Sequence, residues 1–323
     1  MRILFAGSPA IAVPALETLA ALCGGEECFV LSGLLTNPDS SKGRGNKPPE
    51  PTDCAAAMKK IASNIPVLKP EKLDSAARDQ VAALKPDLLV SFAYGKIFGP
   101  KFLGLFPCGG INIHPSLLPR YRGPTPLPAA IINQETETGI TIQKLAAEMD
   151  SGDILIQETV PLNGRETTAS LSEIMAEKAA RLLPAVLRGI AGKTLQAREQ
   201  DHSAASYCFL IEKNDGIIDW NQSAAEIDAR IRAYNPWPLS RTMHGETELL
   251  IHAAEIGEEG GGSGKPLDCS PGQVLGKDDK KGILIKTGDG ILAVKMLQYR
   301  TKKVLEWKSF LNGTRNFIGT RLG

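Results

Sequence analysis

The 323-residue sequence lacks the marks of several protein classes. Its six cysteines show no Cys-x-x-Cys spacing, which argues against a zinc site or a disulfide framework and predicts reduced thiols. The N-terminus has no apolar segment long enough for a signal peptide, and no stretch approaches the length of a membrane span. We therefore expect a cytoplasmic protein with no membrane partner and no bound metal.

A strong net charge and a dinucleotide fingerprint are missing as well. The formal net charge is +1, so no global field points to a polyanionic partner. The first apolar run ends in Gly7-Ser-Pro, as a Rossmann-type unit would, but the Gly-x-Gly-x-x-Gly spacing that admits a pyrophosphate is not present. NAD is therefore not expected as a cofactor.

Strand and helix patterns alternate through the first half of the chain. Ile3 to Ala6 has the pattern of a strand, Ile11 to Leu22 of a helix, Phe29 to Thr36 of a second strand, and Asp87 to Phe92 of a buried strand. Such alternation predicts an α/β fold with a doubly wound, mostly parallel, Rossmann-like sheet.

The character of the sequence changes after a polar stretch at residues 193–206, which we interpret as a linker. Residues 1–192 would form the catalytic domain and residues 207–323 a second, smaller domain. The second domain contains short β-like runs separated by Gly-rich or charged turns. This pattern favours a small β-barrel that resembles the oligonucleotide-binding (OB) fold. Residues 271–323 contain eleven Lys and Arg and only four acidic residues, which gives this stretch a net charge of +7. Such a basic stretch is a candidate nucleic-acid binding surface.

Polar and apolar residues alternate in Ile111-Asn-Ile-His114, so the side chains of Asn112 and His114 project from one face of a strand. Pro115 and Pro119 then break regular structure, which places the pair at a strand end, where open α/β sheets have their binding crevices. A single strand histidine is more often a hydrogen-bonded core residue, yet beside an amide it is also a candidate reaction centre.

The segments around this pair resemble a known family. His114-Pro-Ser-Leu-Leu-Pro119, Arg122-Gly, Thr138-Gly-Ile-Thr-Ile and Glu-Met-Asp150-Ser-Gly-Asp closely match the formyltetrahydrofolate-dependent formyltransferases. Ile218-Asp-Trp220 and Asn235-Pro-Trp-Pro238 extend the similarity to the methionyl-tRNA formyltransferase family, because relatives acting on purine precursors lack this second domain.

The resemblance implies a reaction and its catalytic residues. This family moves a formyl group from 10-formyltetrahydrofolate, a co-substrate, to the α-amine of methionine on initiator tRNA. By similarity, Asn112 and His114 donate to the oxygen of a tetrahedral intermediate, while Asp150 faces them and relays the proton of the amine. No nucleophilic side chain is required, so direct transfer is expected.

The resemblance also implies two binding regions. The folate-binding residues would be Ser116, Leu117, Leu118 and Pro119, with Tyr94 and Gly95 as neighbours of the pocket. The tRNA-binding residues would be three cations of a Gly-containing loop, which can follow phosphates: Lys42, Arg44 and Lys47. The expected partners are methionyl initiator tRNA and the folate donor, and the expected oligomeric state is a monomer.

Other readings share parts of this pattern. A folate-dependent formyltransferase acting on a nucleotide-linked amino sugar would have the same Asn112, His114 and Asp150, although the basic loop and basic tail argue against it. A noncatalytic RNA-binding protein on the same scaffold would not need those three residues. A hydrolase that releases formate is a minor third alternative.

Overall fold

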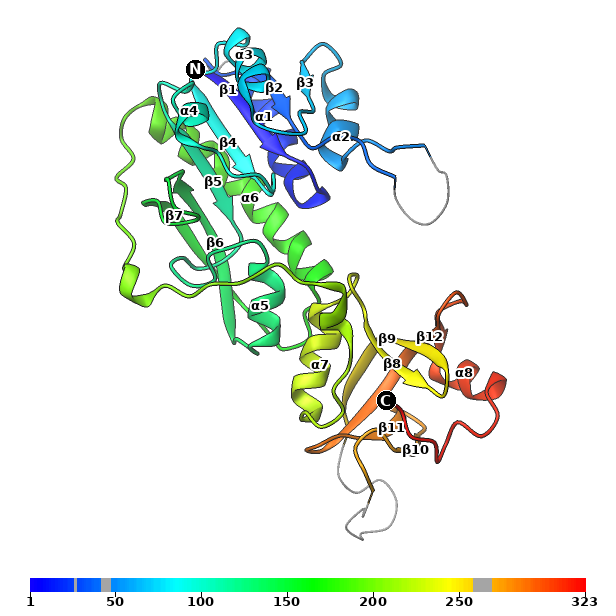
Figure 1. The fold of residues 1–323 in the computed structure, drawn as a ribbon. Coiled ribbons are helices and arrows are strands. Elements are labelled where there is room, and N and C mark those ends of the chain that lie inside the picture. The colour runs from blue at the N-terminus through cyan, green and yellow to red at the C-terminus, as the bar shows by residue number, and fades with distance from the viewer. Residues whose placement is uncertain (26–27, 42–47, 258–268) are drawn as a thin grey trace. The chain divides into compact units, whose positions relative to one another are not determined.

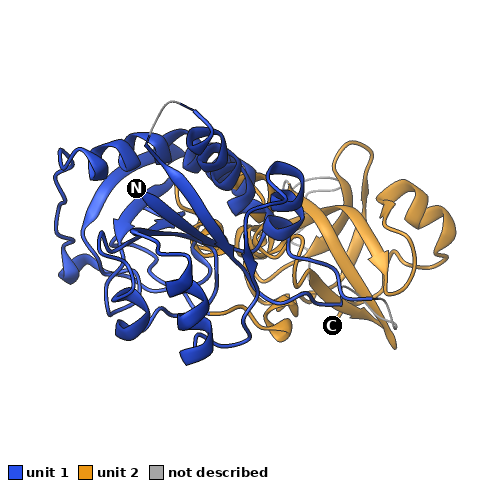
Figure 2. Cartoon of the chain, turned by 90° about the horizontal axis from the view of Figure 1, so that it is seen from above, with its two compact units in different colours: residues 1–126, 137–161, 172–209 blue, residues 127–136, 162–171, 210–323 orange. Residues whose placement is uncertain are grey.

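The computed structural model describes residues 1–25, 28–41, 48–257 and 269–323. These residues divide into two compact units, coloured separately in Figure 2. The first unit consists of Met1–Pro126, Glu137–Pro161 and Ser172–Phe209. The second consists of Leu127–Thr136, Leu162–Leu171 and Leu210–Gly323, so the chain enters the second unit twice before its final passage.

The first unit is built on a seven-stranded sheet with the order β3-β2-β1-β4-β5-β6-β7 (Figure 1). Neighbours among the first five strands pair in parallel, whereas β6 and β7 are antiparallel. The central strands are apolar and buried because helical segments cover a doubly wound sheet on both faces. The strands are β1 (Arg2–Gly7), β2 (Val30–Leu35), β3 (Val67–Leu68), β4 (Leu88–Phe92), β5 (Gly110–His114), β6 (Glu137–Lys144) and β7 (Ile154–Pro161).

Side-chain caps fix the starts of two helices of this unit. The Thr52 hydroxyl accepts a hydrogen bond from Ala55 N at 3.2 Å, and the Asp74 carboxylate accepts one from Ala77 N at 3.0 Å. Each cap satisfies an N–H group that has no partner within its helix. The helical segments here are η1 (Ala10–Ala12), α1 (Val13–Cys23), α2 (Asp53–Ile61), α3 (Ser75–Ala83), α4 (Pro100–Leu103), η2 (His202–Ala204) and most of α6 (Thr168–Ala191).

The carboxyl ends of the parallel strands lie at one edge of the sheet, and β5 reaches that edge at His114. The register between β5 and β6 pairs Asn112 with Gln143 and His114 with Thr141. Directly paired residues point to the same face of a sheet, and so do residues two apart along a strand. The topology therefore gathers four polar side chains on one face at the edge where open α/β sheets bind ligands.

The second unit contains an antiparallel sheet with the strand order β10-β11-β12-β9-β8, and β13 pairs with β12. Helix α7 begins with a capping box formed by Ser223 and Glu226, and its Ile227 and Ile231 belong to the apolar core with Leu249. Its elements are α5 (Pro126–Ile132), η3 (Lys213–Gly216), α7 (Ala224–Ala233), β8 (Ser240–His244), β9 (Thr247–Gly257), β10 (Val274–Asp278), β11 (Gly282–Lys286), β12 (Ile291–Tyr299), β13 (Leu305–Glu306) and α8 (Trp307–Gly313).

The Rossmann-like sheet and the second set of strands confirm the predicted fold class. The sequence pattern did not indicate β8, because four of its five residues are polar. Ser240, Arg241 and Thr242 are nevertheless buried, and Arg241 forms an ion pair with Glu248 at 3.5 Å. None of the helices in the described ranges combines the length and the apolar character needed to span a membrane.

Candidate active site

Asp150 is the centre of a buried polar cluster in the first unit. Its carboxylate Oδ1 accepts hydrogen bonds from Asn112 Nδ2 at 3.1 Å and from Gln143 Nε2 at 3.0 Å. Its Oδ2 accepts one from Gly123 N at 2.9 Å and lies 3.5 Å from His114 Nδ1. The structure thus brings the three predicted catalytic residues together around one carboxylate.

The backbone of Asp150 contributes to this arrangement. Its φ is +53°, in the left-handed region that Asp tolerates better than most residues other than glycine. The residue lies in the turn after β6, and the side chain is only 10% exposed. A buried carboxylate needs donors, and the surrounding amide groups supply them.

The ring of His114 is held from its other side. Nε2 lies 2.8 Å from the carbonyl oxygen of Tyr121, and because a carbonyl only accepts, Nε2 carries a hydrogen. A neutral ring would then turn the lone pair of Nδ1 towards the Asp150 carboxylate, whereas an imidazolium turns an N–H group towards it. Nδ1 is thus the ring nitrogen that faces the carboxylate, and an N–H group at this position can donate to a developing oxyanion.

The segment that follows β5 is anchored by side chains of β6 and β7. Thr141 Oγ1 donates to Ser116 O at 2.7 Å and accepts from Leu118 N at 3.3 Å. Gln157 Nε2 donates both to Leu118 O at 2.9 Å and to Thr141 Oγ1 at 2.9 Å. Ser116 Oγ donates to Arg120 O, so the predicted folate segment has a fixed backbone.

A glycine lets this segment approach β6 closely. A Cβ atom on Gly139 would lie 2.4 Å from Leu117 Cδ2, so no larger residue fits without displacing that side chain. Leu118 is buried, while Leu117 and Pro119 are partly exposed, and the peptide bond between Leu118 and Pro119 is cis. The segment can therefore offer both apolar surface and backbone polar groups to a flat ligand.

Tyr94 and Gly95 occupy different environments. The Tyr94 side chain is 2% exposed and stacks on Phe98, with a centroid distance of 5.4 Å, inside an apolar cluster. Its hydroxyl has no hydrogen-bond partner among the residues that the structure describes, and burial raises the pKa of Tyr94 to about 12. Gly95 has a φ of +81° and open space around the position of a Cβ, so its backbone is the accessible part of this pair.

The three cations expected to bind tRNA, Lys42, Arg44 and Lys47, lie outside the described residues. The ends of their loop are described: Ser40 and Glu50 pair as an antiparallel bridge with two backbone hydrogen bonds of 3.1 and 3.0 Å. Asp39, next to this bridge, forms an ion pair with Lys69 at 2.5 Å. The base of the basic loop is therefore held against the carboxyl end of β3.

The basic C-terminal stretch is partly neutralised within the second unit. Three of its cations form ion pairs with acids, namely Lys277 with Asp279, Lys295 with Glu255 and Arg300 with Glu248. Two of those acids precede residue 271, so the local excess of positive charge is smaller in the folded unit than in the linear sequence.

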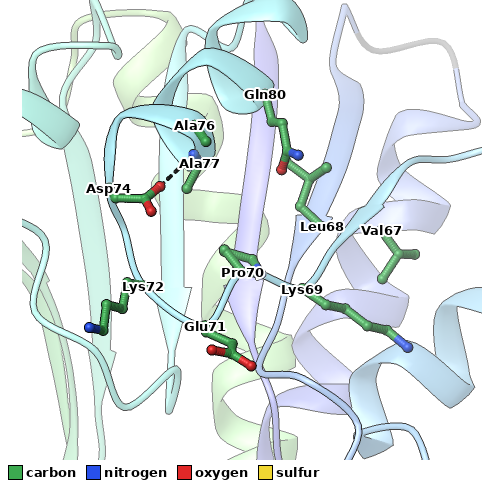
Figure 3. A pocket seen from close by; sticks show the side chains of 10 residues that line it. All are labelled: Val67, Leu68, Lys69, Pro70, Glu71, Lys72, Asp74, Ala76, Ala77 and Gln80. Carbon is green, nitrogen blue, oxygen red and sulfur yellow. Dashed lines mark hydrogen bonds between the residues drawn. The ribbon is translucent and has the colours of Figure 1, made fainter.

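A separate open pocket of about 560 Å³ lies at the other end of the sheet, between β3 and the start of α3 (Figure 3). Its lining residues run from Val67 to Gln80 and include none of the predicted site residues. Four strand spacings separate β3 from β5, roughly 19 Å. The pocket is therefore distinct from the Asp150 cluster.

Sequence reasoning missed several residues of the cluster. Gln143 alternates with Ile140 and Ile142 in the same period that revealed Asn112, so its signal was present. Gly123 contributes through its backbone, which no side-chain pattern could reveal. Among the described residues, no group of three or more His, Cys, Asp or Glu could hold a metal ion.

Comparison with known proteins gives this fold and site a family. The formyl transferase family model matches residues 2–187, and the model of the formyl transferase C-terminal domain matches residues 210–315. The chain belongs to the formyl transferase family, and it is a transferase enzyme.

Curated relatives of this chain carry a more specific name than the family model does. The methionyl-tRNA formyltransferase of Treponema denticola is 49% identical over 98% of both chains, and that of Borrelia hermsii is 40% identical over 99% of both. A solved N-formyltransferase of Helicobacter canadensis, in complex with folinic acid and dTDP-3-aminofucose, is 19% identical, with a TM-score of 0.64 over 90% of this chain and 97% of that one. At that identity the last likeness concerns the fold alone.

Proposed function

We propose that this protein transfers the formyl group of 10-formyltetrahydrofolate to the α-amine of methionyl initiator tRNA. The observation that carries the proposal is the cluster of Asn112, His114 and Asp150 at the carboxyl end of β5. Relatives that share both the length and the name of methionyl-tRNA formyltransferases support the choice of acceptor.

The cluster suits direct acyl transfer. The α-amine attacks the formyl carbon, a new C–N bond forms, and the carbonyl oxygen becomes an oxyanion. Asn112 Nδ2 uses one hydrogen on Asp150 and keeps a second for this oxyanion. Collapse of the intermediate then breaks the bond between the formyl carbon and N10 of the folate.

Proton movement is the task of the other two residues. Asp150 accepts the proton of the attacking amine, directly or through one water, and N10 receives a proton as it leaves. The 3.5 Å separation of His114 Nδ1 from Asp150 Oδ2 is longer than a good hydrogen bond. The His114 N–H group can therefore turn to the oxyanion when it forms.

The two substrates have separate binding regions in this proposal. The folate lies against Ser116, Leu117, Leu118 and Pro119, whose backbone is held by Thr141 and Gln157, and near Tyr94 and Gly95. The tRNA contacts Lys42, Arg44 and Lys47 and the basic second unit, through phosphates and therefore with a strong salt dependence.

The proposed division of labour along the chain has three parts. Residues 1–192 carry Asn112, His114 and Asp150, residues 193–206 form the linker and also bring Gln200 to this site, and residues 207–323 hold the tRNA. The protein acts in the cytoplasm as a monomer.

The experiment that tests this function measures formyl transfer to methionyl initiator tRNA, with a nucleotide-linked amino sugar as competing acceptor. We expect transfer to the tRNA, and a loss of about 100- to 10,000-fold in kcat for His114→Ala, because the imidazole can both donate to the oxyanion and carry a proton. Binding of the tRNA by this variant should stay within twofold. Transfer to the sugar alone, or full turnover without His114, would contradict the proposal.

A further inference from the structure

A buried arginine is connected to the Asp150 cluster through hydrogen bonds of Gln200. Arg122 is 2% exposed, and its guanidinium donates to three uncharged acceptors. Nε and Nη2 both reach Gln200 Oε1, at 3.1 and 2.7 Å, and Nη2 also lies 3.0 Å from His202 Nδ1. Nη1 is 3.4 Å from the Tyr207 hydroxyl. Because a guanidinium has donors only, every one of these contacts fixes an acceptor on the other side.

Arg122 therefore determines which way the amide of Gln200 points. With Oε1 turned to the guanidinium, Nε2 faces the opposite way, where it meets three acceptors. These are Gln143 Oε1 at 3.0 Å, Asp150 O at 2.9 Å and Gly152 O at 2.7 Å. A reversed Gln200 would set its nitrogen against the guanidinium and its oxygen against three oxygens, so only one orientation satisfies the site.

The orientation of the Gln143 amide is fixed in the same way. Gln143 is 1% exposed, and its Oε1 is occupied by the Nε2 donor of Gln200. Its Nε2 must then face Asp150 Oδ1, to which it donates at 3.0 Å. A directional chain of donors runs from Arg122 through Gln200 and Gln143 to the carboxylate.

We propose that Gln200 is a positioning residue of the transfer reaction: it orients Gln143, and through Gln143 it orients the carboxylate of Asp150. This inference rests on the proposed function, since it concerns the same site. Gln200 lies 50 residues from Asp150 in the sequence and contacts its backbone oxygen as well, so it holds both the turn and the side chain.

Loss of this orientation has a defined consequence. A Gln143 amide that is free to rotate presents its oxygen to the carboxylate for part of the time, which is repulsive. The carboxylate then loses a donor that holds it in one position. Turnover should fall, while neither substrate loses a contact.

The decisive variant is Gln200→Glu. A carboxylate at this position still accepts from Arg122, so the buried cation keeps a partner, but it has no hydrogen to give to Gln143. We expect kcat to fall by about 10- to 100-fold, as for a small misplacement of a catalytic group. KM for folate and for tRNA should stay within twofold.

A double-mutant cycle separates positioning from a general structural effect. In a Gln143→Leu background the amide to be oriented is gone, so Gln200→Glu should lower kcat by much less than in the wild type, and the remaining loss should reflect its contacts with Asp150 O and Gly152 O. Gln80→Glu, the same chemical change on the exposed part of α3, is the matched control and should leave kcat within twofold of wild type. Multiplied losses in the double variant would overturn the proposal.

Two further readouts keep the test decisive. If Gln200→Glu does not fold, as judged by its thermal unfolding, Gln200→Met takes its place with the same expected loss of kcat and unchanged KM. Wild-type transfer to methionyl-tRNA is measured first: its absence would refute the proposed function. Wild-type transfer together with an unchanged Gln200 variant, or with a change in KM alone, would refute only the positioning role.

Discussion

The Asp150 cluster and the open pocket beside α3 differ in how their polar groups are used. Around Asp150, donors from β5, β6 and one loop converge on one buried carboxylate. In the pocket, charged side chains make local contacts: Asp74 caps α3 (Figure 3), and Lys69 forms an ion pair with Asp39. The open pocket thus lies where charged side chains make local contacts, and the reactive arrangement lies where several donors converge on one carboxylate.

The difference teaches what defines a reaction centre in this fold. Hydrogen bonds are stronger in a buried environment, and an unmatched polar atom there is costly, so a converging buried network has one arrangement. An exposed charged pocket has many arrangements of similar free energy. Variants in the two regions should therefore differ greatly in effect.

The largest effect is expected for Asp150→Asn. The variant keeps the shape of the side chain but loses the negative charge, and its amide nitrogen would face donors from Asn112, Gln143 or Gly123. We expect kcat for formyl transfer to fall by about 1,000-fold or more, since both proton acceptance and the charge partner of His114 are lost. A variant with a normal thermal unfolding midpoint and more than a tenth of wild-type kcat would break the comparison.

A smaller effect is expected for Thr141→Val. The change removes a buried hydroxyl that joins Ser116 O, Leu118 N and Gln157, and each group left without a partner costs about 1–3 kcal/mol. The segment at residues 116–119 should loosen, and KM for the folate should rise by about 10-fold with a smaller change in kcat. Steady-state kinetics with saturating tRNA measures this, and an unchanged KM would remove that segment from the folate site.

Tyr94→Phe tests whether the Tyr94 side chain belongs to the apolar core or to the folate site. Its hydroxyl is buried without a partner, so removing it should raise the free energy of unfolding by about 1 kcal/mol and leave KM for the folate unchanged. A raised KM would show instead that the hydroxyl turns to the ligand.

The wild-type protein and Tyr94→Phe should also differ in how their free energy of unfolding depends on pH. Burial raises the pKa of Tyr94 from 10.0 to about 12, so the folded state favours the neutral phenol. This contribution is complete below pH 10 and is lost as the pH rises towards 12. Wild type should therefore lose more stability than Tyr94→Phe over that interval, as chemical denaturation at several pH values would measure.

The smallest effect is expected for Lys72→Ala in the open pocket. The side chain is exposed and belongs to no part of the Asp150 network, so transfer kinetics should stay within twofold of wild type. A loss as large as that expected for Thr141→Val would give the pocket a function and erase the contrast between the two regions.

Much of the fold could be predicted because periodicity is a local property. The strand predicted from Asp87 to Phe92 coincides within one residue with β4, and the strand predicted from Ile3 to Ala6 lies within β1. The helix predicted from Ile11 to Leu22 overlaps most of α1. By contrast, β8 was missed because its buried polar residues find partners that the local sequence does not contain.

The site was only partly predictable, for the same reason. Alternation along β5 identified Asn112 and His114, and the same period along β6 carried Gln143. Asp150 was assigned from the family resemblance, because an Asp in a turn has no local signal that distinguishes a catalytic role from a structural one. Nothing near Arg122 or Gln200 in the sequence indicates that they meet.

The sequence by itself determined the alternating strand and helix pattern, the polar face of β5 and the membership of a formyl transferase family. Only the tertiary structure decided that Gly123 and Gln143 donate hydrogen bonds to Asp150, and that Arg122 is linked to Gln143 through Gln200. The physical reason is that a strand pattern depends on neighbours two residues away. A converging hydrogen-bond network depends on strand register and loop closure, which unite residues as far apart as Arg122 and Gln200.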